Sequence, residues 1–184
     1  MSTSTGSLTS WIADQGNVIN NIAASLVPVE KLVTGFAYLM GLTFFFKAIY
    51  TLKTYGESRS SMMSSGGSGG SGMKEPVIYL MVGAMFVYFP SGLALLLNTT
   101  FGSSNILQYA PINSGNSTMT TLFGSGSSMG ASIALIIQVI GVIAFVRGWV
   151  LIARSASQGQ QPGGAGKGMV HVFGGILAMN IVLT

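Results

Sequence analysis

The stretch ASIALIIQVIGVIAFV at residues 131–146 decides the class of this protein. It carries no charged side chain and a single amide, Gln138, and the apolar run extends over residues 129–152 with Arg147 near one end. A helix that rises 1.5 Å per residue needs about 20 such residues to cross the roughly 30 Å of hydrocarbon in a bilayer. The stretch therefore predicts a transmembrane helix.

The whole chain is short of charge, since only 7% of its 184 residues are charged. A soluble domain usually carries about 25% charged residues, so the surface of this protein suits lipid better than water. The length fits one small domain. We therefore predict an all-α membrane protein.

Few residues are available for chemistry: there is no cysteine, one histidine and four acidic residues. Without cysteine there is no disulfide, thiolate metal site or thiol nucleophile. No nucleotide-binding loop, zinc-protease motif or serine-hydrolase motif occurs either. We expect no enzymatic activity, no metal and no cofactor, while a bound phospholipid is compatible with the composition. The basic residues are dispersed, so direct sequence-specific nucleic-acid binding is not expected.

Three further segments have the composition of spans: residues 33–52, 76–97 and 168–184. The second begins with Pro76, which suits the first turn of a helix, whereas Pro90 should kink that helix or end its regular part. The last segment has only 17 residues and reaches the lower limit for a crossing. About four transmembrane helices are expected.

Residues 1–28 form a polar N-terminus with an amphipathic helix. Its apolar side chains share one helical stripe, formed by Leu8, Trp11, Ile12, Val18, Ile19, Ile22 and Leu26. Such a helix can lie in the membrane interface with Trp11 at headgroup depth. It can equally pack against the protein's own bundle.

The remaining chain divides into two predicted hairpins and the loop between them. Residues 29–98 form the first hairpin, whose Gly/Ser-rich loop SSMMSSGGSGGSGM has the composition of a flexible linker. Residues 128–184 form the second hairpin. The uncharged loop at 99–127 carries apolar residues that include Leu107 and Tyr109. We predict that it lies along the outer membrane interface or packs on a periplasmic partner.

The positive charges set the expected orientation. The basic residues of the first and third loops are Lys53, Arg59, Lys74, Arg154 and Lys167. By the positive-inside rule, loops 53–75 and 154–167 face the cytoplasm, and both termini and the 99–127 loop lie outside. Lys31 alone lies on the wrong side, beside Glu30, which can pair with it.

The two predicted hairpins share a sequence pattern. GLTFFFKAIYTL at residues 41–52 matches GVIAFVRGWVLI at residues 141–152, so that Phe45 corresponds to Phe145. A Gly/Ser loop, a lysine and a helix with a mid-membrane glycine follow in each half. Both hairpins turn in the cytoplasm, so the repeat is parallel and differs from the inverted repeats of many transporters.

Lys47 and Arg147 occupy matching positions in this repeat and are the principal candidates for function. They can face a polar lumen or a subunit interface, or contact lipid phosphates. They can also snorkel to the cytoplasmic headgroups, since both lie near a helix end.

Three further polar residues lie within the predicted spans: Gln138, His171 and Asn180. Hydrogen bonding between helices is the expected role of Gln138, which could alternatively line a pore. Structural hydrogen bonding is the expected role of His171 and Asn180, and all three residues are also candidates for a lumen, a lipid phosphate or a subunit interface. The glycines expected at helix–helix contacts are Gly41, Gly83, Gly141, Gly174 and Gly175.

Each predicted hairpin, with its basic cytoplasmic turn, resembles the pilin subunits of type IV secretion systems. The chain from residue 29 to 184 also resembles the IcmC/DotE family of Dot/Icm type IVB secretion systems, which is related to TraQ of IncI-type conjugative plasmids. The resemblance is carried by VEKLVTGFAYLMGL, NTTFGSSNILQYAP, VIAFVRGWVLIARS and GKGMVHVFGGILAMNI. The linker at residues 60–73 departs from it.

The resemblance implies a multi-pass protein of the bacterial inner membrane. Its role would be structural, helping to form or assemble the conduit for protein effectors or DNA as a homo- or hetero-oligomer with other small membrane subunits. Two alternatives stay open. A self-sufficient pore or transporter for ions or small solutes would conduct alone, and an assembly chaperone would be absent from the finished complex.

Overall fold

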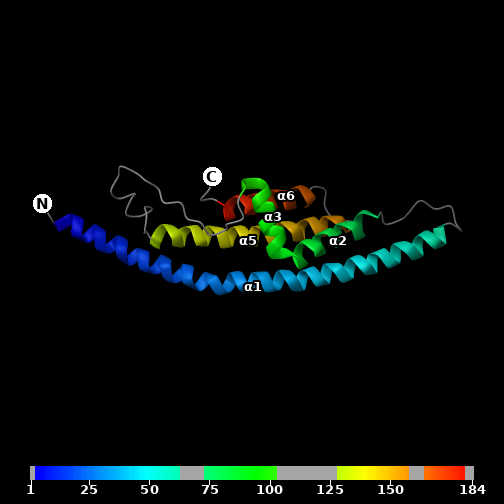
Figure 1. Cartoon of the computed structure of the whole chain (residues 1–184), viewed down its shortest axis with the longest axis horizontal. Helices are drawn as coiled ribbons and strands as arrows, with labels where there is room; N and C mark the ends of the chain where they lie inside the picture. The colour runs from blue at the N-terminus through cyan, green and yellow to red at the C-terminus, as the bar shows by residue number, and fades with distance from the viewer. Residues whose placement is uncertain (1–2, 63–72, 103–127, 158–163, 181–184) are drawn as a thin grey trace.

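The computed structural model of the chain describes residues 3–62, 73–102, 128–157 and 164–180, and within α1 it describes side chains from 14 to 58. These residues form helices and short turns, with no strand among them. The helices are α1 (Thr3–Met62), α2 (Lys74–Val87), α3 (Phe89–Phe101), α5 (Ser128–Ala156) and α6 (Gly164–Met179) (Figure 1). The predicted all-α class is confirmed.

Helix α1 has 60 residues and is therefore about 90 Å long, roughly three times the thickness of the hydrocarbon layer. It joins the predicted amphipathic helix and the predicted span at 33–52 into one element. The helix continues through Pro28 without a break at the boundary expected between residues 28 and 29. Its hydroxyl groups donate to carbonyls one turn earlier, as from Thr34 to Glu30 at 3.0 Å and from Thr43 to Leu39 at 2.9 Å. These bonds satisfy the hydroxyls where lipid offers no partner.

The described part of the predicted apolar stripe is only partly covered. Val18 is 52% exposed and Ile22 49% exposed, whereas Ile19 and Leu26 are half-buried beside the buried Ala23, at one edge of the stripe. Asn20 Oδ1 accepts a hydrogen bond of 2.6 Å from the Ser132 hydroxyl of α5. This part of the helix therefore meets the bundle through one edge of the stripe and the adjoining Asn20. The side chain of Trp11 lies outside the described part.

Two helices are long and apolar enough to cross a membrane, namely Asp14–Ser58 within α1 and Met129–Ala156 within α5. They contain the predicted spans at 33–52 and 129–152. A third crossing is present if α2 and α3 together form one broken span. These lengths and compositions indicate a helical membrane protein.

The predicted span at 76–97 is broken. Helices α2 and α3 meet at an angle of 94°, and Tyr88 at the break departs from helical geometry with φ −100° and ψ 29°. Pro90 occupies the first turn of α3, as Pro90 was predicted to kink or end the regular helix. A proline removes a backbone donor and clashes with the preceding turn, so the helix ends before it and restarts in a new direction.

The predicted span at 168–184 corresponds to α6, which begins at Gly164 and has 16 residues. Its length is therefore about 24 Å, less than the hydrocarbon thickness. Residues 181–184 lie outside the described residues. Among the described residues, two helices, or three segments with α2 and α3 counted as one broken span, are long and apolar enough to cross a membrane, and α6 falls short of that length.

The helices pack as two pairs. Helix α2 returns along α1, and α6 returns along α5, while α5 lies on the concave side of the bowed α1 and runs in the same direction (Figure 1). The ends of α1 and α5 and the starts of α2 and α6 are therefore gathered toward one end of the molecule.

The same glycine contact closes both pairs. A Cβ atom on Gly83 of α2 would lie 3.1 Å from the Phe45 nitrogen and 3.2 Å from the Gly41 oxygen of α1. A Cβ atom on Gly175 of α6 would lie 2.7 Å from the Phe145 nitrogen and 2.6 Å from the Gly141 oxygen of α5. The residues aligned in the sequence repeat thus make equivalent contacts in the two pairs.

The α5–α6 pair has a second close contact between helices at a glycine. A Cβ atom on Gly148 would lie 2.7 Å from the oxygen of Gly168, which was not among the predicted packing residues. Gly174 was among the predicted packing residues. Unlike Gly175, it makes no close contact, because a Cβ atom on Gly174 would meet nothing within 4 Å. Gly174 therefore plays no part in packing between the described helices.

A chain of aromatic rings joins the two pairs. Phe44 of α1 stacks on Tyr79 and Phe86 of α2 with ring centroids 6.1 Å apart. Phe86 continues to Phe89 of α3, and Phe89 to Phe145 of α5 at 6.0 Å. Such offset and tilted ring pairs are favourable beyond their buried area, and they form the centre of the core.

The glycine contact makes a specific prediction for stability. Replacing Gly175 with alanine should lower the free energy of unfolding by about 1–3 kcal/mol, because the new methyl group meets backbone atoms that cannot move aside. Gly174→Ala is the matched control and should leave stability unchanged or raise it by up to about 1 kcal/mol through helix propensity. Helix content followed by circular dichroism during an SDS titration in detergent micelles measures both. Equal losses in the two variants would contradict the assigned contact.

Candidate functional site

Lys47 lies over a tyrosine of the neighbouring helix. Its Nζ atom is 4.4 Å from the centre of the Tyr79 ring, close enough for a cation–π interaction. Tyr79 is 1% exposed, and its hydroxyl donates to Ser157 Oγ at 3.2 Å. Ser157 in turn donates to the Arg154 carbonyl oxygen at 2.9 Å. The cluster therefore ties α1, α2 and the end of α5 together.

The repeat places His171 where Tyr79 lies, since each residue comes four positions before the packing glycine of its helix. His171 makes a different contact, because its Nδ1 atom lies 2.8 Å from the carbonyl oxygen of Lys167. A carbonyl oxygen can only accept, so Nδ1 carries the proton. The hydrogen bond stays within α6, in keeping with the structural role predicted for His171, and does not engage Arg147.

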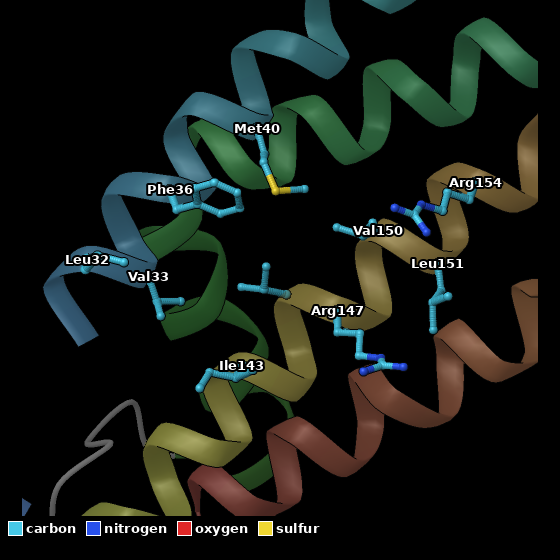
Figure 2. Close-up of a pocket in the computed structure, with 10 residues that line it drawn as sticks. Leu32, Val33, Phe36, Met40, Ile143, Arg147, Val150, Leu151 and Arg154 are labelled. Carbon is cyan, nitrogen blue, oxygen red and sulfur yellow. The ribbon is translucent and has the colours of Figure 1, made fainter. Parts of the chain in front are cut away.

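An open groove lies between α1 and α5 (Figure 2). Its volume is about 530 Å³. The side chains that line it are Leu32, Val33, Phe36 and Met40 from α1, and Ile143, Val146, Arg147, Val150, Leu151 and Arg154 from α5. Figure 2 shows Met40 and Val150 pointing toward one another across the gap, and the Arg154 side chain reaching back toward Val150. The groove is apolar except for its two arginines.

The backbone positions of the two arginines lie on the same side of α5, while Figure 2 shows the Arg154 side chain directed toward Val150 and the Arg147 side chain directed toward α6. The two arginines are seven residues apart, which is two helical turns and about 10 Å along the axis. Both are exposed, and neither forms a salt bridge, since the ion pair found in the described residues joins Lys53 and Glu57 at 3.7 Å. Two unpaired guanidinium groups therefore stand beside an apolar surface.

The structure separates the predicted pair of Lys47 and Arg147, because Lys47 contacts Tyr79 and does not line the groove. Arg147 is instead joined by Arg154, which sequence reasoning placed in a loop. The seven-residue spacing of Arg147 and Arg154 was the feature of the sequence that could have placed both on one side of a helix. Glu30 and Lys31, which were expected to pair, form no salt bridge within the described part of the chain.

Gln138 and Asn180 are the two buried polar side chains, at 4% and 3% exposure, among the residues whose burial is described. The contacts of Gly148 with Val172 and of Gly141 with Met179 set the antiparallel register of α5 and α6. Gln138 lies three residues before Gly141, and Asn180 lies one residue after Met179, so both amides lie near the same end of the α5–α6 pair.

Large apolar side chains cover the outer surfaces of the pairs. Phe46 and Tyr50 of α1 are 67% and 70% exposed, and Val170 of α6 is 70% exposed. Among the described residues, no three acidic or histidine side chains come together as metal ligands would. The predicted partner residues Leu107 and Tyr109 lie outside the described residues.

Comparison with known proteins found no protein-family model, no curated protein and no solved structure that matches this chain.

The bond between Tyr79 and Ser157 can be tested by a double-mutant cycle. Tyr79→Phe and Ser157→Ala each remove one partner, and we expect a coupling of about 0.5–1.5 kcal/mol in unfolding free energy, the usual net value of a hydrogen bond. Ser155→Ala is the matched control, because Ser155 bonds the Ile152 carbonyl within α5. An SDS titration measures all the variants. Strict additivity of Tyr79→Phe with Ser157→Ala would exclude the bond.

Proposed function

We propose that the protein is a structural inner-membrane subunit of a type IVB secretion or conjugation apparatus. In this role it helps to form or assemble the conduit for protein effectors or DNA. The observation that carries the structural part of the proposal is the large apolar surface that the chain leaves uncovered. Only 17% of the most apolar window of α1 is buried, and α6 presents Phe173 and Leu177 at more than half exposure.

The exposed apolar surface extends over both helix pairs, with Phe46 and Tyr50 on α1 and Val170 on α6 among its most exposed residues. In lipid it costs nothing, and it offers broad faces to neighbouring membrane helices. The two helix pairs with equivalent glycine contacts favour a subunit built for repeated helix packing. The secretion assignment itself rests on the sequence resemblance of residues 29–184.

We propose that the chain crosses the membrane as two hairpins with cytoplasmic turns. The gathering of helix ends in Figure 1 brings the basic residues Lys53, Lys74, Arg154 and Lys167 toward one end of the molecule. This common end is the cytoplasmic one by the positive-inside rule. The bent α2–α3 pair and the short α6 then supply the two returning segments.

Cysteine labelling tests this orientation on a chain that has no cysteine of its own. In inner-membrane vesicles of defined sidedness, Thr54→Cys should react with a membrane-impermeant maleimide only from the cytoplasmic face. Asn17→Cys should react only from the periplasmic face, and Leu39→Cys, between them, should be protected by lipid. Reaction of the two outer positions from the same face would refute a crossing by α1.

Assembly tests the function. Tagged protein extracted from its native membrane in mild detergent should migrate as a large complex and retain other small membrane subunits. Native mass and the identity of the co-purifying proteins are read together. A lone monomer that conducts ions in proteoliposomes would contradict the proposal and favour a self-sufficient pore.

Gly174→Leu sharpens the same experiment. Its side chain would enter open space on the apolar outer face of α6, so the chain should fold normally while close approach by another helix is blocked. We expect the recovered complex to fall several-fold. Gly166→Leu, which also enters open space but near the start of α6, should not reduce it. Full assembly of both variants would remove this face of α6 from the proposed subunit contacts.

A further inference from the structure

We propose that the groove between α1 and α5 binds one anionic phospholipid. Its phosphate is held by Arg147 and Arg154, and its acyl chains lie along the apolar wall formed by Leu32, Val33 and Phe36. The inference does not depend on the proposed secretion role, and only the choice of leaflet rests on the proposed crossing with cytoplasmic turns.

The charge of the groove selects the head of the ligand. A guanidinium group presents a planar set of donors that matches phosphate oxygens and binds them in pairs. Neither Arg147 nor Arg154 meets a carboxylate in the described residues, so both forks are free to take an anion. Cations within the membrane are costly unless an anion or water compensates them, and a lipid phosphate provides that compensation at the site itself.

The lining selects the rest of the ligand. Apart from the arginines, every residue that lines the groove is apolar, and a volume of about 530 Å³ falls within the roughly 300–1,000 Å³ of ligand pockets. From Ile143 to Arg154 the groove follows α5 for about 16 Å. An elongated apolar cleft with cations toward one end matches a lipid better than a compact phosphate metabolite.

The polarity of the groove also fits the bilayer. Arg154 lies in the last turn of α5, and Leu32 lies at the opposite end of the groove from it (Figure 2). A phospholipid of the cytoplasmic leaflet has the same polarity, with its phosphate at the basic end and its acyl chains directed to the membrane centre.

A helix from a second copy suits the groove less well. An apolar helix would cover Arg147 and Arg154 without offering a partner, and an unpaired cation is costly to bury. The chain has only four acidic residues in total, and one of them, Glu57, already pairs with Lys53. The anion is therefore better supplied by lipid.

Binding of added lipid to the full-length, delipidated protein in a neutral detergent tests the proposal. Phosphatidylglycerol, phosphatidylcholine and free glycerol 3-phosphate are titrated separately, and bound molecules are counted by native mass spectrometry. We expect one phosphatidylglycerol per chain, with weaker binding of phosphatidylcholine and still weaker binding of glycerol 3-phosphate.

Charge variants locate the head of the lipid. Arg147→Gln with Arg154→Gln should weaken phosphatidylglycerol binding by about tenfold for each arginine, the usual loss for one charge-assisted hydrogen bond. Lys74→Gln with Lys167→Gln removes the same net charge outside the groove and should change the affinity less than threefold. Circular dichroism verifies that all variants keep their helix content. Unchanged binding in the arginine variant, or an equal loss in the lysine control, would overturn the site.

Apolar variants locate the tail. Phe36→Ser, within the groove, should weaken phosphatidylglycerol binding several-fold, whereas Phe46→Ser, exposed on α1 outside it, should not. Glycerol 3-phosphate binding as tight as that of phosphatidylglycerol would show a phosphate site without a lipid. A protein dimer that dissociates on mutation of Arg147 and Arg154 would assign the groove to a second copy, and each of these results overturns the proposal.

Discussion

Close backbone contact at glycines is the constraint on which the rest of the structure depends. In lipid, apolar side chains gain little by leaving their surroundings, so helices associate through van der Waals packing at short range. Gly175 lets α6 approach so closely that a single methyl group would lie 2.6 Å from the Gly141 oxygen. Gly83 does the same for α2 on α1, with slightly more room. These contacts set the register of each pair, and the contact of Lys47 with Tyr79 follows from the register of the first pair.

The register explains where the polar groups are found. Because Gly83 meets Phe45, Tyr79 one turn away falls beneath Lys47, and its hydroxyl reaches Ser157 beyond α5. In the other pair, Gln138 and Asn180 both lie beyond the contact of Gly141 with Met179, at the opposite end. The pairs then join through rings and through the bond from Ser132 to Asn20, which leaves the groove partly open between α1 and α5.

Much of this fold could be predicted from local sequence. Residues 131–146 are uncharged over a bilayer's thickness, so their helix was predicted correctly, and Pro90 marked a real break. Two features were not predictable in this way. A boundary was predicted after residue 28, yet α1 continues through Pro28, because a proline removes one backbone hydrogen bond and the rest of the long helix keeps its own. The 94° turn after Tyr88 depends on how α3 packs against α1 and α2, which no local pattern contains.

The candidate site shows a similar division. Periodicity places Arg147 and Arg154 on one side of α5, but it does not say that α1 stands opposite them, because the partner of a face is a tertiary property. The sequence repeat aligned Lys47 with Arg147 and implied a common role, but the contacts of the two side chains differ.

The two helix pairs share equivalent close contacts at glycines, while the side chains beside those contacts differ. In the first pair the cation at this position is engaged by an aromatic ring of its own hairpin, because Tyr79 lies one turn before the packing glycine. In the second pair His171 stands at the corresponding place and hydrogen-bonds within α6. Arg147 therefore has no partner in its own pair and lines the groove with Arg154. A cation that one repeat uses to hold helices together is left in the other repeat for a ligand from outside the described chain.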